Sequence, residues 1–296
     1  MRALVIGGDS AIGRALTDKL KSQQDTVFFT TRRSTPAHGN AVHLDLASSD
    51  TETTHLPQTD IAYFCAAITG FAACRNDRKL AERVNFSAPS ALARRLVDAG
   101  SRVVFLSSNA VFDWSEPHVP VSREPHPLTE YGHFKAKAEQ EFSALGPAAS
   151  ILRLSKVLRA DDGLFAGWIN HLIQKKNINA YVDHYFAPIS LADTVDALLA
   201  ISQSPGGGIF QMSGARDVSY FDAARRLASL TNADPKLVVP VRAAESGVPA
   251  TEIIHNSTLD SSRITALTGW TPRDPVSVID DVFRDPIGRS AVTNRF

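Results

Sequence analysis

The sequence predicts an α/β protein built on a doubly wound parallel sheet of the Rossmann type, followed by a smaller C-terminal lobe. Short apolar runs alternate with segments of helical periodicity through the first half of the chain, and the first apolar run leads directly into a glycine-rich turn. After about residue 155 this alternation loosens. Alternating strands and helices imply parallel strands with right-handed crossovers, and continuous apolar strands fit a sheet that helices cover on both faces.

Six short, apolar segments of the first half are expected to form the strands of this sheet. They are residues 3–6, 26–30, 41–44, 61–66, 103–106 and 151–154. Helices are expected where apolar residues recur at spacings of three or four. Such spacing occurs around Ile12, Leu16 and Leu20, and over residues 80–99 and 131–145.

Residues 1–155 are therefore interpreted as a dinucleotide-binding domain, and residues 156–296 mainly as a substrate-binding lobe. In the second part, a helix is expected over residues 164–175 and a short strand near residues 180–182. A helix over residues 191–202 and a strand over residues 209–212 are expected to return to the first sheet, so residues 190–212 are assigned to the first domain. The last eighty or so residues are expected to hold short helices and proline-bounded turns.

The composition is that of an ordinary soluble globular protein and argues against several functional classes. The 296 residues are 44% hydrophobic, and 31 Lys and Arg balance 31 Asp and Glu, with no basic run that would favour nucleic acid. No apolar stretch approaches the roughly 20 residues that span a bilayer, so no membrane partner is expected. The two cysteines are expected to be reduced thiols of a cytoplasmic protein. A homodimer is compatible with these observations, and no metal is expected, because the histidines and carboxylates show no metal-ligand spacing.

The segment Gly7-Gly8-Asp9-Ser10-Ala11-Ile12-Gly13 follows the first strand and opens the first helix, which is the context of a dinucleotide-binding turn. Gly7 permits a tight turn, Gly13 lets the helix pack closely on the strand, and the helix N-terminus can bind a pyrophosphate. Ser10 stands where a glycine is usual, so its side chain must point away or hydrogen-bond a phosphate. The Asp9 carboxylate would be repelled by phosphates unless it faces solvent. The cofactor-binding residues expected in this turn are Gly7, Ser10, Ala11, Ile12 and Gly13.

Two arginines follow the second strand, at the place where an acidic residue would bind the ribose diol of NAD. Arg32 and Arg33 are suited to bidentate contact with a 2′-phosphate, which favours NADP as the cofactor. NAD remains an alternative because Asp45 follows the third strand. We expect Asp45 and Leu46 to lie along the adenine.

A tyrosine and a lysine four residues apart share one face of the helix expected over residues 131–145. The Lys135 ammonium, together with a positive nicotinamide, would lower the pKa of the Tyr131 phenol from its usual value of about 10. Tyr131 could then donate a proton to a carbonyl oxygen or accept one from an alcohol, and Lys135 could also hold the nicotinamide ribose. Ser108 follows the fifth strand at the carboxyl edge of the sheet, where it could hydrogen-bond the substrate carbonyl.

These residues resemble the extended short-chain dehydrogenase/reductases that act on nucleotide sugars, and most of all the dTDP-4-dehydrorhamnose reductase family. The resemblance spans almost the whole chain, and its most specific part is the pair Tyr131 and Lys135 in order with the segment around Ser108 and the run Val111-Phe112-Asp113. It implies that Ser108, Tyr131 and Lys135 form the catalytic triad and that the region after Lys156 forms the sugar-nucleotide lobe. The resemblance also includes residues after the fourth strand and in the following helix. It implies that the cofactor-binding residues there are Ala66, Ala67, Ile68 and Asn85.

Three departures from the family pattern lie on or near the expected substrate face. Ser108-Asn109 replaces the usual Thr-Asp, Trp114 replaces a glycine, and the run at residues 184–187 replaces a glutamine-phenylalanine-glycine run. These departures allow a substrate other than a rhamnose precursor. The proline after this run would hold His184 and Tyr185 over the nicotinamide site, with Trp114 covering the pocket from the other side. The expected substrate-binding residues are Ser108, Asn109, Trp114, His184 and Tyr185.

Three functions fit these residues. The first is an NAD(P)H-dependent reductase of a nucleotide-linked keto sugar or a similar polar ketone, with Tyr131 as the proton donor. The second is a nucleotide-sugar epimerase that stores the hydride transiently and returns it to the other face. The third is a regulatory subunit that binds the dinucleotide with little turnover, which the departures at Ser10 and Asp9 favour. Dehydration is not expected, because Asn109-Ala110 stands where dehydratases carry an Asp-Glu pair.

Overall fold

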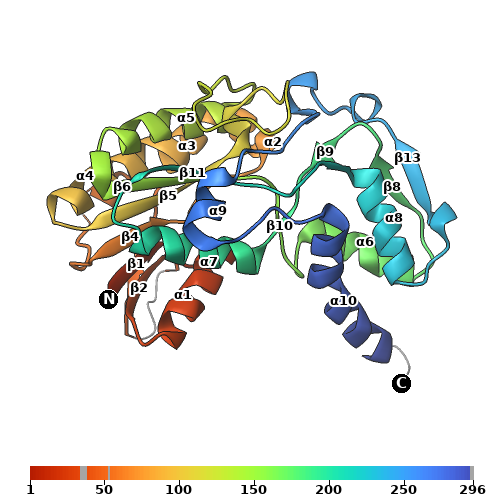
Figure 1. Ribbon diagram of the computed structural model, residues 1–296, viewed down its shortest axis with the longest axis horizontal. Helices are drawn as coiled ribbons and strands as arrows, with labels where there is room; N and C mark the ends of the chain where they lie inside the picture. Colours follow the sequence, from red (N-terminus) through yellow and green to blue (C-terminus); the bar gives the residue numbers. More distant parts are fainter. Residues whose placement is uncertain (34–38, 53, 294–296) are drawn as a thin grey trace.

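The computed structural model describes residues 1–33, 39–52 and 54–293. Its main sheet has seven parallel strands and lies on the left in Figure 1. The strands are β1 (Arg2–Ile6), β2 (Thr26–Thr31), β3 (Ala41–His43), β4 (Ile61–Phe64), β5 (Arg102–Ser108), β6 (Ala149–Leu154) and β11 (Gly208–Met212). Their order is β11-β6-β5-β4-β1-β2-β3, and every neighbouring pair is parallel. This is the doubly wound strand order with one additional edge strand, so the predicted fold class is confirmed.

Helices cover both faces of this sheet, as its continuous apolar strands require. On one face lie α1 (Ala11–Ser22) and α7 (Leu191–Gln203), and on the other lie α4 (Ala88–Asp98) and α5 (Glu130–Ser143). The alternation of side chains along β1 shows the division: Val5 packs in the cluster that contains α1, whereas Leu4 packs in the cluster that contains α5.

The helix expected over residues 80–99 is divided in the structure. α2 (Phe71–Asn76) and α3 (Arg78–Glu82) precede a π-helical turn at Arg83–Ser87, and α4 follows. Pro89 at the start of α4 has no N–H group to donate to the carbonyl of Asn85, which interrupts the regular α-helical ladder at the π turn. Asn85 lies on this wider turn.

A second group of elements packs beside the sheet, on the right in Figure 1. Its helices are α6 (Gly163–Ile173), α8 (Tyr220–Leu230) and α10 (Pro275–Thr293), and α9 (Ser262–Thr268) lies near α7. Its strands form three small pairs, β7 (Val157–Leu158) with β10 (Ile189–Ser190), β8 (Ile178–Tyr181) with β13 (Val238–Val241), and β9 (Tyr185–Phe186) with β12 (Val218–Ser219). The pair of β9 and β12 is antiparallel. A separate apolar cluster around Phe165, Phe186 and Phe283 forms the core of this group.

The expectation of only short helices near the C-terminus is wrong for α10, which has 19 residues. Val278, Ile279 and Phe283 recur at helical spacing on α10, and all three are buried in the core of the second group of elements. Tertiary packing against this apolar face therefore stabilises a long helix where the proline-rich composition predicts turns.

Within the part of the chain that the structure describes, no helix is both long and apolar enough to cross a membrane. The two cysteines, Cys65 and Cys74, are both free and buried.

Candidate active site

A cavity of about 490 Å³ lies between the carboxyl edge of the sheet and the second group of elements. Its floor is formed by the ends of β4, β5 and β6, and one wall is formed by α5. The opposite wall comes from the later part of the chain and includes His184, Tyr220 and Ile254. Ligands of doubly wound sheets bind at this edge, so the fold itself makes the cavity a candidate active site.

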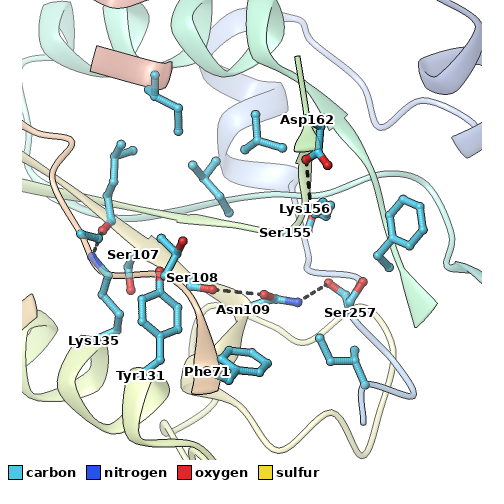
Figure 2. A pocket seen from close by; sticks show the side chains of 18 of the residues that line it. Phe71, Ser107, Ser108, Asn109, Tyr131, Lys135, Ser155, Lys156, Asp162 and Ser257 are labelled. Atoms are coloured by element: carbon cyan, nitrogen blue, oxygen red, sulfur yellow. Dashed lines mark hydrogen bonds and ion pairs between the residues drawn. The ribbon is translucent and has the colours of Figure 1, made fainter. Parts of the chain in front are cut away.

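Ser108 is the last residue of β5, and its hydroxyl is oriented by the turn that follows. Its Oγ accepts a hydrogen bond from the N–H group of Ala110 and donates one to Asn109 Oδ1, both at 3.2 Å. Asn109 Nδ2 in turn donates to the carbonyl oxygen of Ser257 at 3.4 Å (Figure 2). This chain of bonds joins the end of β5 to the opposite wall of the cavity.

Tyr131 lies in the first turn of α5, close to Ser108 (Figure 2). The Thr129 side chain caps this helix by accepting a hydrogen bond from the N–H group of Gly132 at 3.1 Å. A Cβ atom at Gly132 would lie 2.0 Å from the carbonyl oxygen of Ala110, so only glycine lets α5 approach the turn after β5 this closely. The close approach brings the phenol beside the serine.

Burial raises the pKa of Tyr131, and hydrogen bonding with Ser108 acts in the opposite direction. Lys135 is 2% exposed, and its Nζ donates to the carbonyl oxygen of Leu106 at 2.7 Å. Burial lowers the pKa of Lys135 to about 8, and Glu139 opposes this effect. Lys135 Nζ lies 5.9 Å from the centre of the Tyr131 ring. Burial is the largest influence on the pKa of the phenol in the structure, which holds no nicotinamide.

A buried ion pair supports α5 behind these residues. Arg153 Nη2 lies 2.7 Å from Glu139 Oε2, and Arg153 Nη1 donates to Gln211 Oε1 at 3.0 Å. Glu139 and Arg153 are 3% and 2% exposed. The partners of Arg153 on α5 and β11 were not predicted from the sequence.

The glycine turn fits a dinucleotide. Gly7 has a φ of +89°, and a Cβ atom there would lie 2.6 Å from the N atom of Ala66, so the turn leaves no room for a side chain. Ser10 Oγ accepts a hydrogen bond from the N–H group of Gly13 at 3.0 Å, so Ser10 caps α1 and does not need a phosphate partner. The first N–H groups of a helix have no carbonyl partner within it, and they can bind phosphate oxygens.

The other residues expected at the cofactor site fall into two groups. Ile12, Ala66 and Ala67 line the cavity. Asn85 does not line it, because its side chain bonds both backbone groups of Ile68, at 2.9 Å each, and braces the loop after β4. Five more residues lie outside the cavity: Ile68, Arg32, Arg33, Asp45 and Leu46. Arg32 and Arg33 are exposed beyond β2, and Leu46 is buried. Asp45 Oδ1 accepts a hydrogen bond from the N–H group of Ala47.

Of the substrate residues expected from the 184–187 run, His184 lines the cavity and Tyr185 does not. His184 Nδ1 accepts a hydrogen bond of 3.1 Å from the N–H group of Ile254, and its ring stacks on Tyr220 at 5.0 Å. Burial lowers the pKa of His184 to about 4. Tyr185 instead pairs with Ser219 across β9 and β12.

Trp114 also differs from its expected position over the pocket. It is 2% exposed and packs against Phe71, with ring centroids 6.0 Å apart. Phe71, rather than Trp114, lines the cavity, and its ring lies 6.1 Å from that of Tyr131. Trp114 therefore supports the wall from behind.

Several lining residues were not predicted. Lys156 lies beyond the end of β6 and pairs with the buried Asp162 at 3.3 Å (Figure 2). Ser107 is 5% exposed, and its Oγ has no hydrogen-bond partner among the described residues. The rule that ligands bind beyond the carboxyl ends of parallel strands could have found Ser107 and Lys156. In the described part of the chain, no three His, Cys, Asp or Glu side chains lie close enough together to hold a metal ion.

The parallel sheet, the glycine turn and the grouping of Ser108, Tyr131 and Lys135 define an extended short-chain dehydrogenase/reductase, an NAD(P)-linked oxidoreductase class. The family model described as the RmlD substrate binding domain matches residues 1–285, and the chain belongs to that family.

Known proteins agree with this placement. The dTDP-4-dehydrorhamnose reductase of Mycobacterium tuberculosis is 29% identical over 222 residues, which is 72% of each chain. The methionine adenosyltransferase 2 subunit beta of Bos taurus is 23% identical over 295 residues, 94% of this chain and 85% of that protein.

Two solved structures show the same fold. MoeE5 in complex with UDP-glucuronic acid and NAD has a TM-score of 0.83 and 22% identity, covering 98% of this chain and 100% of that chain. The dTDP-4-dehydrorhamnose reductase of Bacillus anthracis in complex with NADP has a TM-score of 0.82 and 20% identity, covering 96% and 99%.

Proposed function

We propose that this protein is an NAD(P)H-dependent reductase of a nucleotide-linked keto sugar or a similar polar ketone. The observation that carries this proposal is that Ser108, Tyr131 and Lys135 line the same cavity at the carboxyl ends of the strands. A hydroxyl, a phenol and an ammonium group placed there can orient a carbonyl, protonate it and hold a ribose. The family and the name of the Mycobacterium tuberculosis relative support the class of substrate.

In the proposed reaction, the Ser108 hydroxyl turns from Asn109 to donate a hydrogen bond to the substrate carbonyl oxygen. Tyr131 donates its proton to the same oxygen, and the raised pKa of its phenol keeps this proton available at neutral pH. A bound nicotinamide supplies the hydride for the carbonyl carbon. An ammonium has three N–H donors, so Lys135 can keep its bond to Leu106 and still donate to two ribose hydroxyls.

The opposite wall offers groups that suit a polar, anionic substrate. Lys156 and Arg159 line the cavity there, and Lys156 pairs with the carboxylate of Asp162. Because His184 Nδ1 is the acceptor for Ile254, Nε2 carries the ring hydrogen and is free to donate to the substrate. The low pKa of His184 keeps this donor neutral throughout the physiological range.

A stoichiometric assay tests the proposal against its alternatives. Incubation with NADPH or NADH and a panel of nucleotide-linked 4-keto sugars should oxidise the dinucleotide in step with the formation of the alcohol. Interconversion of two nucleotide sugars without net oxidation would establish the epimerase instead. Binding of the dinucleotide with no conversion of any sugar would favour a regulatory subunit. The similarity to a methionine adenosyltransferase subunit supports this alternative.

A further inference from the structure

A carboxylate lies at the place where the adenosine ribose of a dinucleotide is expected. Asp9 belongs to the turn between β1 and α1, and its side chain is exposed. Its Oδ2 accepts a hydrogen bond of 2.6 Å from Thr31 Oγ1, and Thr31 is the last residue of β2. The carboxylate is therefore held at the carboxyl end of β2, although it comes from a different segment of the chain.

Further hydrogen bonds fix the turn against this strand. The N–H group of Gly7 donates to Thr30 Oγ1 at 2.8 Å, and the N–H group of Gly8 donates to the carbonyl oxygen of Thr30 at 3.0 Å. The turn is thus tied to the last two residues of β2 by backbone and side-chain contacts. This arrangement preorganises the Asp9 carboxylate rather than leaving it to move in solvent.

The end of the second strand decides between the two dinucleotides in this class of fold. An acidic residue there accepts hydrogen bonds from the ribose hydroxyls of NAD, whereas an arginine accommodates the 2′-phosphate of NADP. In this chain the strand ends in a threonine, and Arg32 and Arg33 follow with exposed side chains. The position therefore combines one fixed carboxylate with two cationic side chains.

We propose that Asp9 is a specificity-determining residue that takes the role of the acidic residue missing from β2. Its carboxylate accepts hydrogen bonds from the ribose diol of NADH, and it opposes the 2′-phosphate of NADPH by charge repulsion. Arg32 and Arg33 attract the same phosphate, so the protein binds both dinucleotides, with affinities within about tenfold of each other. This inference rests on the proposed dinucleotide-dependent function and names the residue that balances the two arginines.

Calorimetric titration of the purified protein with NADH and with NADPH, at one fixed ionic strength, tests this role without any sugar substrate. Asp9→Asn keeps an oxygen acceptor for Thr31 and removes the charge. We expect it to raise the ratio of NADPH to NADH affinity about tenfold. The double variant Arg32→Ala/Arg33→Ala should lower the same ratio. Asp18→Asn, which removes an exposed carboxylate from the far part of α1, is the matched control and should leave the ratio within about twofold.

A second variant guards against an effect of Asp9→Asn on folding. Thr31→Val removes the hydroxyl that holds the carboxylate and should move the ratio in the same direction by a smaller factor. A ratio within twofold of the unmodified protein for both Asp9→Asn and Thr31→Val would overturn the proposal. Failure of the unmodified protein to bind either dinucleotide would overturn this inference and the proposed function together. Binding with the expected ratios but without sugar reduction would support the role of Asp9 and overturn only the reductase.

Discussion

The guanidinium of Arg153 donates to both carboxylate oxygens of Glu139, one helical turn beyond Lys135 on α5. Both side chains are almost completely buried, and the same guanidinium reaches Gln211 on β11. The pair therefore joins α5, β6 and β11 under the wall of the cavity. Removing one partner of such a pair leaves an uncompensated charge in the protein interior.

Glu139→Gln should lower the free energy of unfolding by about 3 kcal/mol, because the Arg153 cation would keep its burial and lose its counter-charge. Glu141→Gln on the same helix is the matched control. Glu141 pairs with Arg94, and these side chains are 32% and 60% exposed, so the loss should stay below about 1 kcal/mol. Urea denaturation measures both variants, and equal losses would contradict the special role of the buried pair.

The ionisation of Lys135 should make the unfolding free energy depend on pH. Its native pKa is lowered to about 8 from the usual 10.5, so between these values the unfolded chain binds more protons than the native protein. The unfolding free energy therefore gains a contribution that rises with pH across this window, by up to about 3 kcal/mol. Lys135→Met lacks this contribution, so its stability relative to the unmodified protein should fall from pH 8 to pH 10.

Denaturant titrations at several pH values measure that difference. Lys137→Met, two residues along the same helix and exposed, is the control and should show a difference from the unmodified protein that does not change with pH. A pH-independent difference for Lys135→Met would mean that its ammonium is not desolvated as the structure indicates.

Tyr131→Phe keeps the ring and removes the proton donor. Turnover of the keto sugar should fall by roughly 10²–10⁴-fold, while the dinucleotide binds as before. Tyr63→Phe removes a hydroxyl from a buried tyrosine of β4 outside the cavity and should leave turnover unchanged. Steady-state kinetics together with calorimetry would check both, and turnover of Tyr131→Phe within twofold of the unmodified protein would exclude the phenol as the acid.

His184→Ala should raise KM for the sugar or change the substrate preference, with little effect on dinucleotide affinity. The reason is that His184 lines the wall opposite Ser108, Tyr131 and Lys135, and that Ile254 occupies its Nδ1, which leaves Nε2 as the proposed donor to the sugar. Since its pKa is lowered to about 4, the ratio of KM values between variant and unmodified protein should stay constant from pH 6 to pH 8. His133→Ala, an exposed histidine on α5, is the control. Unchanged kinetics for His184→Ala would show that this residue does not contact the substrate.

The periodicity of the sequence was sufficient to predict the sheet and most of its helices, because those elements bury continuous apolar faces. In the structure, α7 packs on one face of the first sheet and β11 pairs with β6 at its edge. The π turn before α4 was missed because it depends on one proline within an otherwise regular pattern. The length of α10 was missed because its apolar face is recognisable only with the partners that cover it.

The wall that carries Ser108, Tyr131 and Lys135 was more predictable than the opposite wall for a physical reason. Ser108, Tyr131 and Lys135 lie on a strand end and one helix, where spacing in the sequence fixes spacing in the structure. Lys156 and Asp162 lie in the loops on either side of β7, and Tyr220 begins α8, so these side chains meet only through tertiary packing. For the same reason, the hydrogen bond between Asp9 and Thr31 could not be found from the sequence, where the two residues are 22 positions apart.

The position of β11 at the edge of the sheet has a consequence for how the chain folds during synthesis. Once β6 has left the ribosome, residues 155–212 must still be added before β11 can pair with it, which takes roughly 3 to 12 s at 5–20 residues per second. During this interval β6 is an open edge strand, and open edges favour association between nascent chains. Gln211 lies on β11, so its hydrogen bond with Arg153 also cannot form until β11 has been synthesised. Nascent chains of this protein should therefore depend on chaperones most strongly just before residue 212 emerges.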